Sequence, residues 1–207
     1  MTTNNENYEN YWKNESKGNR WQIGMADKWG GFRERPDVDW VRGIIKDFKV
    51  TSVVDIGCGT GRLFPVWFKL GVHAVGLEFS DIEYPFTEAN AIKYGLYSKQ
   101  LNIITDHYPE KFDLVFSTQV TLHILPEDIR SALENMDRMS NGLIGCVTFY
   151  MPGKGHLRPG LSYPNKNSWN HDYPKLFDDL GYDMIRSEIL YREDDKTGYA
   201  LLFKRRD

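Results

Sequence analysis

The sequence contains little of what marks a membrane protein or a disulfide-bonded secreted protein. Only two of its 207 residues are cysteines, Cys58 and Cys146, and their positions suggest neither a disulfide framework nor a metal site. No apolar run reaches the roughly 18 residues that a membrane-spanning helix needs. The polar residues 1–15 do not resemble a signal peptide. These absences predict a reduced, cytoplasmic protein with no metal ion and no membrane partner.

Concentrated charge of one sign is also missing. The chain carries 26 Lys and Arg residues against 29 Asp and Glu residues, and no block of like charge stands out. Proteins that bind a nucleic-acid backbone usually present a basic stripe, so nucleic acid is not the expected partner. Aromatic residues, in contrast, make up 14% of the chain, and some of them are expected to line a ligand pocket rather than the core.

Apolar periodicity along the chain predicts alternating strands and helices. The expected strands span residues 52–56, 74–78, 101–105, 113–117 and 143–150, and later 182–191 and 197–204. The expected helices span residues 37–48, 62–70, 87–94, 127–139 and 173–180. Such alternation predicts an α/β fold in which helices cover a parallel sheet. Residues 1–36 are predicted to form a helical or irregular extension, a cap, on a main domain spanning 37–207.

The segment from Val53 to Leu63 is the most informative part of the chain. A short apolar strand is followed by three glycines, Gly57, Gly59 and Gly61, and then by an amphipathic stretch typical of a helix. Glycine has no Cβ, so the backbone can approach a ligand closely, and the free N–H groups at a helix start point toward that ligand. Such a turn binds either a dinucleotide or S-adenosylmethionine (SAM).

Two details distinguish these ligands. The dinucleotide pattern GxGxxG requires glycine at the position of Arg62. Asp55, two residues before Gly57, would repel a pyrophosphate, whereas a carboxylate suits a ligand that carries an ammonium and a sulfonium group. The turn therefore favours SAM.

With these residues the chain resembles the class I SAM-dependent methyltransferases, whose first motif reads (D/E)xGxGxG. His73–Glu78 looks like the second strand of that family, and residues 112–120 look like its fourth strand and the following loop. The resemblance implies a Rossmann-like three-layer sandwich. Its seven-stranded sheet is mostly parallel and ends in an antiparallel C-terminal hairpin.

The resemblance also implies residue roles. Glu78, at the end of the second strand, would bind the ribose hydroxyls, and Asp106, after the third strand, would contact the adenine amino group. Thr118 and Gln119 follow the fourth strand, at the end where open α/β sheets bind ligands, and would contact either SAM or the acceptor. The expected cofactor-binding residues are Asp55, Gly57, Cys58, Gly59, Thr60, Gly61, Glu78, Phe79, Asp106, Thr118 and Gln119.

His123 is the candidate catalytic base, because the ordinary pKa of histidine suits proton removal near neutral pH. The competing interpretation is a histidine that only satisfies backbone groups at a helix start. The long segment 151–172 is predicted to form a lid over the acceptor, together with the tryptophans of the N-terminal extension. Its candidate acceptor residues are His156, Arg158, Tyr163, Trp169 and His171.

The predicted function is methyl transfer from SAM to oxygen or nitrogen of a small-molecule acceptor. The loop after the fourth strand, residues 117–120, lacks the (N/D)PP(Y/F) pattern of enzymes that methylate base amines, and neither cysteine follows a proline. Both observations point away from nucleic acid. Two alternatives stay open: a nicotinamide-dependent oxidoreductase of similar fold, and a SAM-binding protein without catalysis. The sequence does not predict the oligomeric state.

Overall fold

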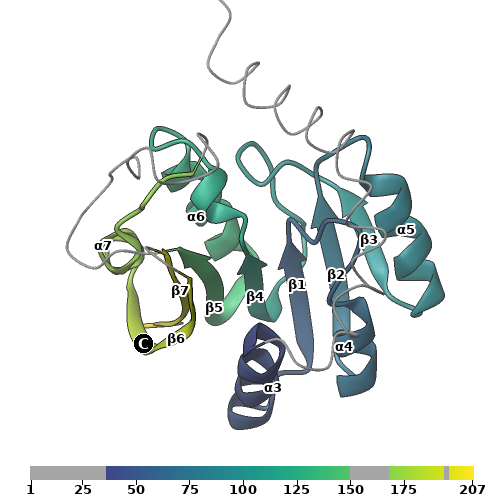
Figure 1. Cartoon of the computed structure of the whole chain (residues 1–207), viewed down its shortest axis with the longest axis horizontal. Helices are drawn as coiled ribbons and strands as arrows, with labels where there is room; N and C mark the ends of the chain where they lie inside the picture. Colours follow the sequence, from purple (N-terminus) through teal and green to yellow (C-terminus); the bar gives the residue numbers. More distant parts are fainter. Residues whose placement is uncertain (1–35, 150–167, 194–195) are drawn as a thin grey trace, which may run out of the picture.

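Seven strands form one sheet in the computed structural model, which describes residues 36–149, 168–193 and 196–207 (Figure 1). The strands are β1 (Ser52–Ile56), β2 (His73–Glu78), β3 (Tyr97–Gln100), β4 (Phe112–Thr118), β5 (Ser140–Phe149), β6 (Tyr182–Glu193) and β7 (Lys196–Arg205). The helices are α3 (Pro36–Phe48), α4 (Phe64–Leu70), α5 (Tyr84–Lys93), α6 (Ile129–Arg138) and α7 (Tyr173–Asp178), with a 3-10 turn, η1 (Thr121–His123). The proposed cap and most of the proposed lid lie outside the described residues.

The strand order is β3-β2-β1-β4-β5-β7-β6. The first five strands in this order pair in parallel, and β7 pairs antiparallel with both β5 and β6. The predicted fold class is therefore confirmed, including the C-terminal hairpin. The chain runs from β1 outward to β3 and then returns to β4 on the other side of β1. In open α/β sheets, ligands bind at the carboxyl ends of the strands at such a switch point.

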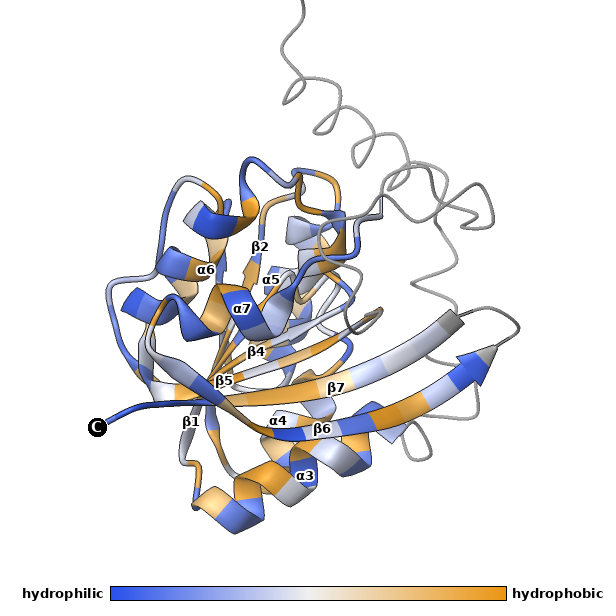
Figure 2. Ribbon diagram, turned by 90° about the vertical axis from the view of Figure 1, so that its left-hand side faces the viewer, coloured by the Kyte–Doolittle hydropathy of each residue, from blue (hydrophilic) through white to orange (hydrophobic). Residues whose placement is uncertain are grey.

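Helices cover both faces of the sheet (Figure 2). Helices α6 and α7 pack on one face in a cluster that contains Met136, and α3, α4 and α5 pack on the other in a cluster that contains Trp67. Because side chains alternate along a strand, Val54 of β1 belongs to the first cluster and Val53 to the second. Burial on both faces explains why the central strands read as continuous apolar runs.

The prediction of the third strand at residues 101–105 is wrong. The structure places β3 at Tyr97–Gln100, an edge strand with mostly exposed side chains, and residues 101–105 form a bend beyond it. An edge strand needs little apolar character, so periodicity misses it. The apolar residues Leu101 and Ile103 pack against the ends of the central strands instead of forming a strand themselves.

The described ranges contain no helix that is both long enough and apolar enough to cross a bilayer. They also contain no group of three or more His, Cys, Asp or Glu side chains that could hold a metal ion. Cys58 and Cys146 are both buried with free thiols.

Close packing under the glycine turn gives a stability prediction. A Cβ atom on Gly76 of β2 would lie 2.5 Å from Cζ of Phe64 and 2.8 Å from Sγ of Cys58. Overpacking of this kind should make Gly76→Ala lower the free energy of unfolding by about 1–3 kcal/mol.

Gly43→Ala in α3 is the matched control, because the nearest atom to its Cβ is 3.9 Å away. It should raise the free energy of unfolding by about 0.5–1 kcal/mol through helix propensity. Urea denaturation of both variants measures the difference, and equal effects would contradict the packing argument.

Candidate functional site

The turn between β1 and α4 has the backbone that its glycines predict. Gly57, Gly59 and Gly61 have φ angles of 60°, 57° and 84°, in the left-handed region that strains other residues. A Cβ on Gly57 would lie 2.4 Å from Cγ2 of Val120, and one on Gly61 would lie 2.5 Å from Cδ2 of Phe64. The first and third glycines are thus required both by conformation and by close approach.

Side chains from two other elements hold this turn in place. The Gly59 N–H donates to Oε2 of Glu78 at 3.0 Å. From α5, the Thr87 hydroxyl donates to the Gly59 carbonyl, and Nδ2 of Asn90 donates to the Thr60 carbonyl at 2.6 Å. Sequence reasoning missed Thr87 and Asn90. Their spacing of three residues on one helix face is the signal that could have paired them.

Glu78 connects β2 to the glycine turn. The residue is 5% exposed, and its carboxylate accepts a second backbone hydrogen bond, from the Ser80 N–H at 2.8 Å. Burial raises the pKa of Glu78, and the hydrogen bonds from Ser80 and Gly59 partly oppose that rise. Glu78 thus lies where the resemblance expects the ribose-binding acid, and its contact with ribose remains a prediction.

Asp55 lies beneath the turn on the α4 side of the sheet. Its Oδ2 accepts a hydrogen bond from Nε1 of Trp67 at 3.1 Å, and among the described residues its Oδ1 has no hydrogen-bond partner. Burial raises the pKa of Asp55 to about 7, opposed by the Trp67 hydrogen bond and by the charge of Arg62. Arg62 in turn pairs with the buried Asp37 at 2.7 Å. A contact between Asp55 and SAM remains a prediction.

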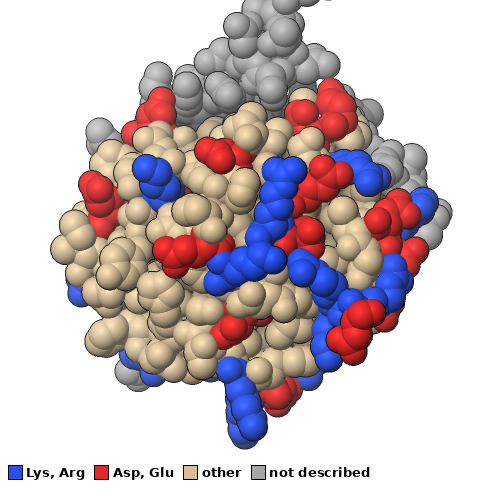
Figure 3. Space-filling view, turned by 180° about the vertical axis from the view of Figure 1, so that it is seen from behind, with Lys and Arg blue, Asp and Glu red and all other residues tan. Residues whose placement is uncertain are grey.

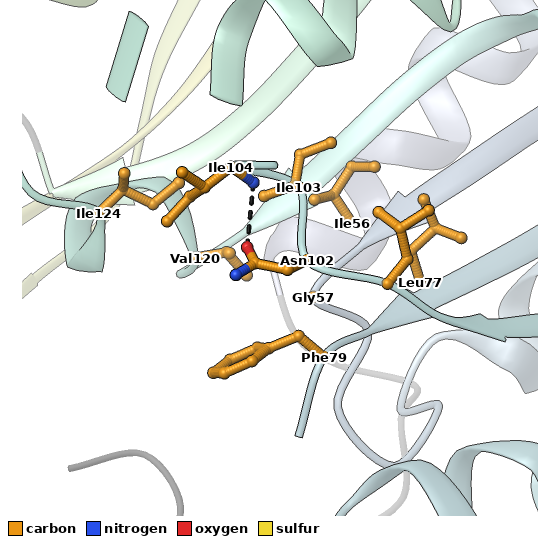
Figure 4. A pocket seen from close by; sticks show the side chains of 10 residues that line it. Ile56, Gly57, Leu77, Phe79, Asn102, Ile103, Ile104, Val120 and Ile124 are labelled. Atoms are coloured by element: carbon orange, nitrogen blue, oxygen red, sulfur yellow. Dashed lines mark hydrogen bonds between the residues drawn. The ribbon is translucent and has the colours of Figure 1, made fainter. Parts of the chain in front are cut away.

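A pocket opens beside the turn at the carboxyl ends of the strands (Figure 4). Its walls come from the ends of β1 and β2, the bend after β3 and the loop after β4. They are formed by Ile56, Gly57, Leu77, Phe79, Leu101, Asn102, Ile103, Ile104, Val120 and Ile124. The walls are apolar apart from Asn102, whose Oδ1 accepts a hydrogen bond from the Ile104 N–H at 3.0 Å. This bond fixes the direction of the Asn102 amide.

Of the predicted cofactor residues, Gly57 and Phe79 line this pocket, whereas Asp106 does not. The Asp106 side chain is exposed, and its Oδ1 accepts a hydrogen bond from the His107 N–H at 2.8 Å. Asn102 lies in the pocket wall instead. Asn102 was not predicted as a site residue, because residues 101–105 were expected to form a strand.

Thr118 and Gln119 lie at the carboxyl end of β4, outside the pocket wall, and both are half-buried. Gln119 has a φ angle of 59°, unusual for a residue other than glycine. Its Nε2 donates to the hydroxyl of Tyr191 on β6. No local pattern in the sequence predicts this contact, since Tyr191 lies in the last hairpin, 72 residues from Gln119.

His123 ends the η1 turn and is half-buried, with Nδ1 3.4 Å from Oγ of Ser168. The end of the proposed lid packs on this turn, because the Trp169 N–H donates to the Leu122 carbonyl at 2.7 Å and the buried His171 lies 3.0 Å from the Ile124 carbonyl. A catalytic role for His123 remains a prediction. His156, Arg158 and Tyr163 are outside the described residues.

The raised pKa of Asp55 gives a prediction about stability and pH. In the unfolded chain Asp55 ionises near its ordinary value of 3.8, and in the folded chain near 7. Between these values the folded state binds more protons, so the contribution of Asp55 to stability falls as pH rises. Relative to the wild type, Asp55→Asn should therefore gain about 1–3 kcal/mol in free energy of unfolding between pH 5 and pH 8.

Asp113→Asn is the control for this measurement. Hydrogen bonds from Thr51 and Ser52 lower the pKa of Asp113 below 3.8, in spite of an opposing effect of burial. Its effect on stability should therefore not change between pH 5 and pH 8. Urea denaturation at several pH values measures both variants, and a pH-independent effect of Asp55→Asn would refute the buried-acid assignment.

Known proteins share this domain. Residues 54–141 match a family model described as a methyltransferase domain. The chain is 26% identical over 159 residues to a ubiquinone biosynthesis O-methyltransferase of Roseobacter denitrificans, covering 72% of this chain and 63% of that protein. The chain thus spans less than two thirds of the length of that relative.

Solved structures share the fold over nearly the whole chain. A magnesium protoporphyrin IX methyltransferase from Synechocystis with bound SAM has a TM-score of 0.68 at 13% identity and covers 96% of this chain and 97% of its own. A TehB-like SAM-dependent methyltransferase from Corynebacterium glutamicum has a TM-score of 0.68 at 17% identity and covers 93% of this chain and 98% of its own. The chain thus contains a match to a methyltransferase domain and has the fold of class I SAM-dependent methyltransferases.

Proposed function

We propose that this chain transfers the methyl group of SAM to a small-molecule acceptor, with oxygen as the favoured receiving atom. The observation that carries the proposal is the glycine turn, fixed by Glu78 and α5, beside an apolar pocket at the switch point of the sheet. The choice of oxygen is supported by the O-methyltransferase name of the ubiquinone-biosynthesis relative.

The residues of the site suit the parts of SAM. The apolar wall with Phe79 and Ile103 suits a flat adenine ring, and the fixed amide of Asn102 offers it a hydrogen bond. Glu78 suits the ribose hydroxyls, and the N–H groups of the turn suit the carboxylate of the methionine part. Gly57 presents backbone without a side chain to this pocket, as close approach to a ligand requires.

Methyl transfer requires mainly that the protein align SAM and the acceptor. SAM supplies a methyl group already activated by its sulfonium leaving group. The chain binds both molecules and orients the acceptor atom toward that methyl, which removes most of the entropic cost of the encounter. A base is needed only for an acceptor that must lose a proton, and His123 is the candidate for that step.

The surface charge supports a small acceptor. On the face drawn in Figure 3, a band of Lys and Arg side chains crosses the centre and right of the view, and Asp and Glu side chains lie along and among them. A polymer with a phosphate backbone is recognised by concentrated positive charge. We therefore favour an acceptor without such a backbone.

Two binding and transfer experiments test the proposal. Calorimetric titration with SAM, S-adenosylhomocysteine and NAD should show binding of the first two only. With methyl-labelled SAM and a cell extract, label should appear in the small-molecule fraction. Binding of NAD would favour an oxidoreductase, binding of SAM without transfer would favour a non-catalytic protein, and label in RNA, DNA or protein alone would refute the small acceptor.

Glu78 provides a mutational test of the cofactor site. Glu78→Ala should weaken the binding of SAM and of S-adenosylhomocysteine equally, by about 1–3 kcal/mol, because both ligands carry the same ribose. Parallel calorimetric titrations measure the two dissociation constants. Normal binding of both ligands would place the ribose elsewhere, and a selective loss of SAM would assign Glu78 to the sulfonium instead.

The adenine site can be tested by a matched pair of substitutions. Asn102→Ala should weaken SAM binding by about 0.5–1.5 kcal/mol, because the pocket loses its one fixed amide. Asp106→Ala should leave the dissociation constant unchanged within twofold, since that carboxylate is exposed and outside the pocket wall. The reverse result would restore Asp106 as the adenine contact.

A further inference from the structure

The sheet ends at β6, a strand of 12 residues that forms its outer edge (Figure 2). Within the described parts of the chain, β6 pairs with β7 on one side and with no strand on the other. The backbone N–H and C=O groups along such an edge can pair with a further strand, and proteins usually protect a long edge with charge, proline or a covering element. The side chains of β6 therefore indicate whether this edge is protected or suits a partner.

The edge exposes apolar side chains. Seven large hydrophobic side chains are exposed in the described ranges, and three of them, Met184, Ile185 and Ile189, lie within six residues of β6. Each of the three is 42–43% exposed, and the strand contains no proline. Exposed apolar residues that gather on one element typically mark a contact surface. The composition of β6 thus favours pairing with a partner.

The centre of β6 keeps regular strand geometry. Its pairing with β7 is irregular just before Arg186 and just after Ile189, whereas the four residues from Arg186 to Ile189 pair one to one with residues of β7. Beyond the second irregularity, Tyr191 contacts its own chain. A Cβ atom on its partner Gly198 would lie 2.1 Å from Cζ of Tyr191, and Gln119 donates to the Tyr191 hydroxyl. The regular segment is therefore the part of the edge that suits a further strand.

Two side chains of opposite charge lie in this segment. Arg186 and Glu188 are two positions apart, so both project to the α3 face of the sheet. Nη2 of Arg186 donates to Oδ2 of Asp47 on α3 at 2.8 Å, while its Nε lies 3.9 Å from Oε1 of Glu188. Glu188 is thus held only loosely within its own chain, and its side chain is 50% exposed. A second cation can reach this carboxylate.

A second copy of β6, running antiparallel, matches this charge pattern. When Ser187 of one chain lies opposite Ser187 of the other, Arg186 lies opposite Glu188 in both directions. Ile185 likewise lies opposite Ile189. A shift of one residue places Arg186 opposite Ser187 or Ile189, and a shift of two places two Arg186 or two Glu188 side chains together. Like charges directly opposite one another destabilise a sheet, so the charges favour the register centred on Ser187.

We infer that two copies of this chain associate through their β6 edges, antiparallel about Ser187, into a homodimer with one continuous sheet. The backbone edges pair, Arg186 and Glu188 form two reciprocal ion pairs, and Ile185 and Ile189 cover part of each other's exposed surface. A two-fold interface of this kind closes on itself and limits assembly to two chains. Two edge strands make a smaller contact than a standard interface, so we expect a dissociation constant of about 1–50 µM. The inference does not depend on the proposed function.

Sedimentation of the full chain tests the dimer and its location. Over about 1–200 µM the wild type should pass from the mass of one chain to that of two. Ile189→Lys places a charge on the apolar edge and should weaken association at least about tenfold. Ile92→Lys on α5 is the matched control, because Ile92 is 73% exposed and lies far from β6 in the sheet order; it should leave association unchanged. A wild type that stays monomeric over this range overturns the inference and leaves the edge to a different protein.

A charge exchange tests the register. Arg186→Glu gives a chain with two acids on the edge, and Glu188→Arg gives one with two bases, so each variant alone should be monomeric. An equimolar mixture should form a heterodimer, because every pair across the interface again has opposite charges. Arg186→Glu also loses the contact with Asp47, so circular dichroism and urea denaturation check the fold of both variants.

Three results of these measurements would contradict the proposed interface. A dimer that survives both Ile189→Lys and Glu188→Arg would place the interface elsewhere, and a dimer weakened equally by Ile92→Lys would make the effect of added charge unspecific. A mixture of two folded variants that stays monomeric would refute the register centred on Ser187. If Arg186→Glu does not fold, Glu188→Arg and Ile189→Lys decide the question by themselves, because Glu188→Arg keeps Arg186 on Asp47.

Discussion

The hydrogen bonds from the Gly59 and Ser80 N–H groups to the buried carboxylate of Glu78 are the constraint on which the site depends. They connect the turn after β1 to the turn after β2, and the pocket residues Gly57 and Phe79 lie next to these two anchors. Burial opposes ionisation of Glu78, and two charge-assisted hydrogen bonds offset part of that cost. Backbone donors that would otherwise lack partners at the start of a ligand-binding turn are thereby satisfied.

The sheet separates Asp55 and Trp67 from the apolar pocket beside the glycine turn. On the α4 side, Asp55 accepts a hydrogen bond from Trp67, and Arg62, which pairs with the buried Asp37, acts through its charge to lower the pKa of Asp55. On the other side, Ile56 and the residues after β3 form an apolar wall. The alternation of side chains along β1 produces this division, because adjacent residues of a strand point to opposite faces. Asp55 therefore contacts Trp67, whereas Ile56, its neighbour in sequence, lines the pocket on the other face of the sheet.

Local patterns in the sequence were sufficient to predict the fold class, and they located the glycine turn and the acid at the end of β2. The glycine pattern and the acid that ends an apolar stretch are both visible within short segments of sequence, and helix–strand alternation predicts the parallel sheet. The position of β3 could not be predicted from the sequence, because an exposed edge strand has no apolar pattern. The apolar segment after it has the pattern expected of a strand. Asn102 was not predicted as a pocket residue for the same reason. Tyr191 lies 72 residues from Gln119, and their contact depends on strand pairing that no local pattern records.

Gln119 and Val120 show how one backbone conformation can connect the glycine turn to the C-terminal hairpin. The left-handed φ of Gln119 turns the chain sharply at the end of β4, so that its side chain reaches Tyr191 while Val120 packs on Gly57. A residue in the ordinary right-handed or extended region would send this pair along a different path. The strain at Gln119 is therefore coupled to the positions of both the glycine turn and the hairpin. Gly57 and Gly198 each lack the Cβ that would block these contacts, so the two glycines and the strained Gln119 depend on one another. The position of Tyr191 in the hairpin and the position of the glycine turn are thus linked through the consecutive residues Gln119 and Val120.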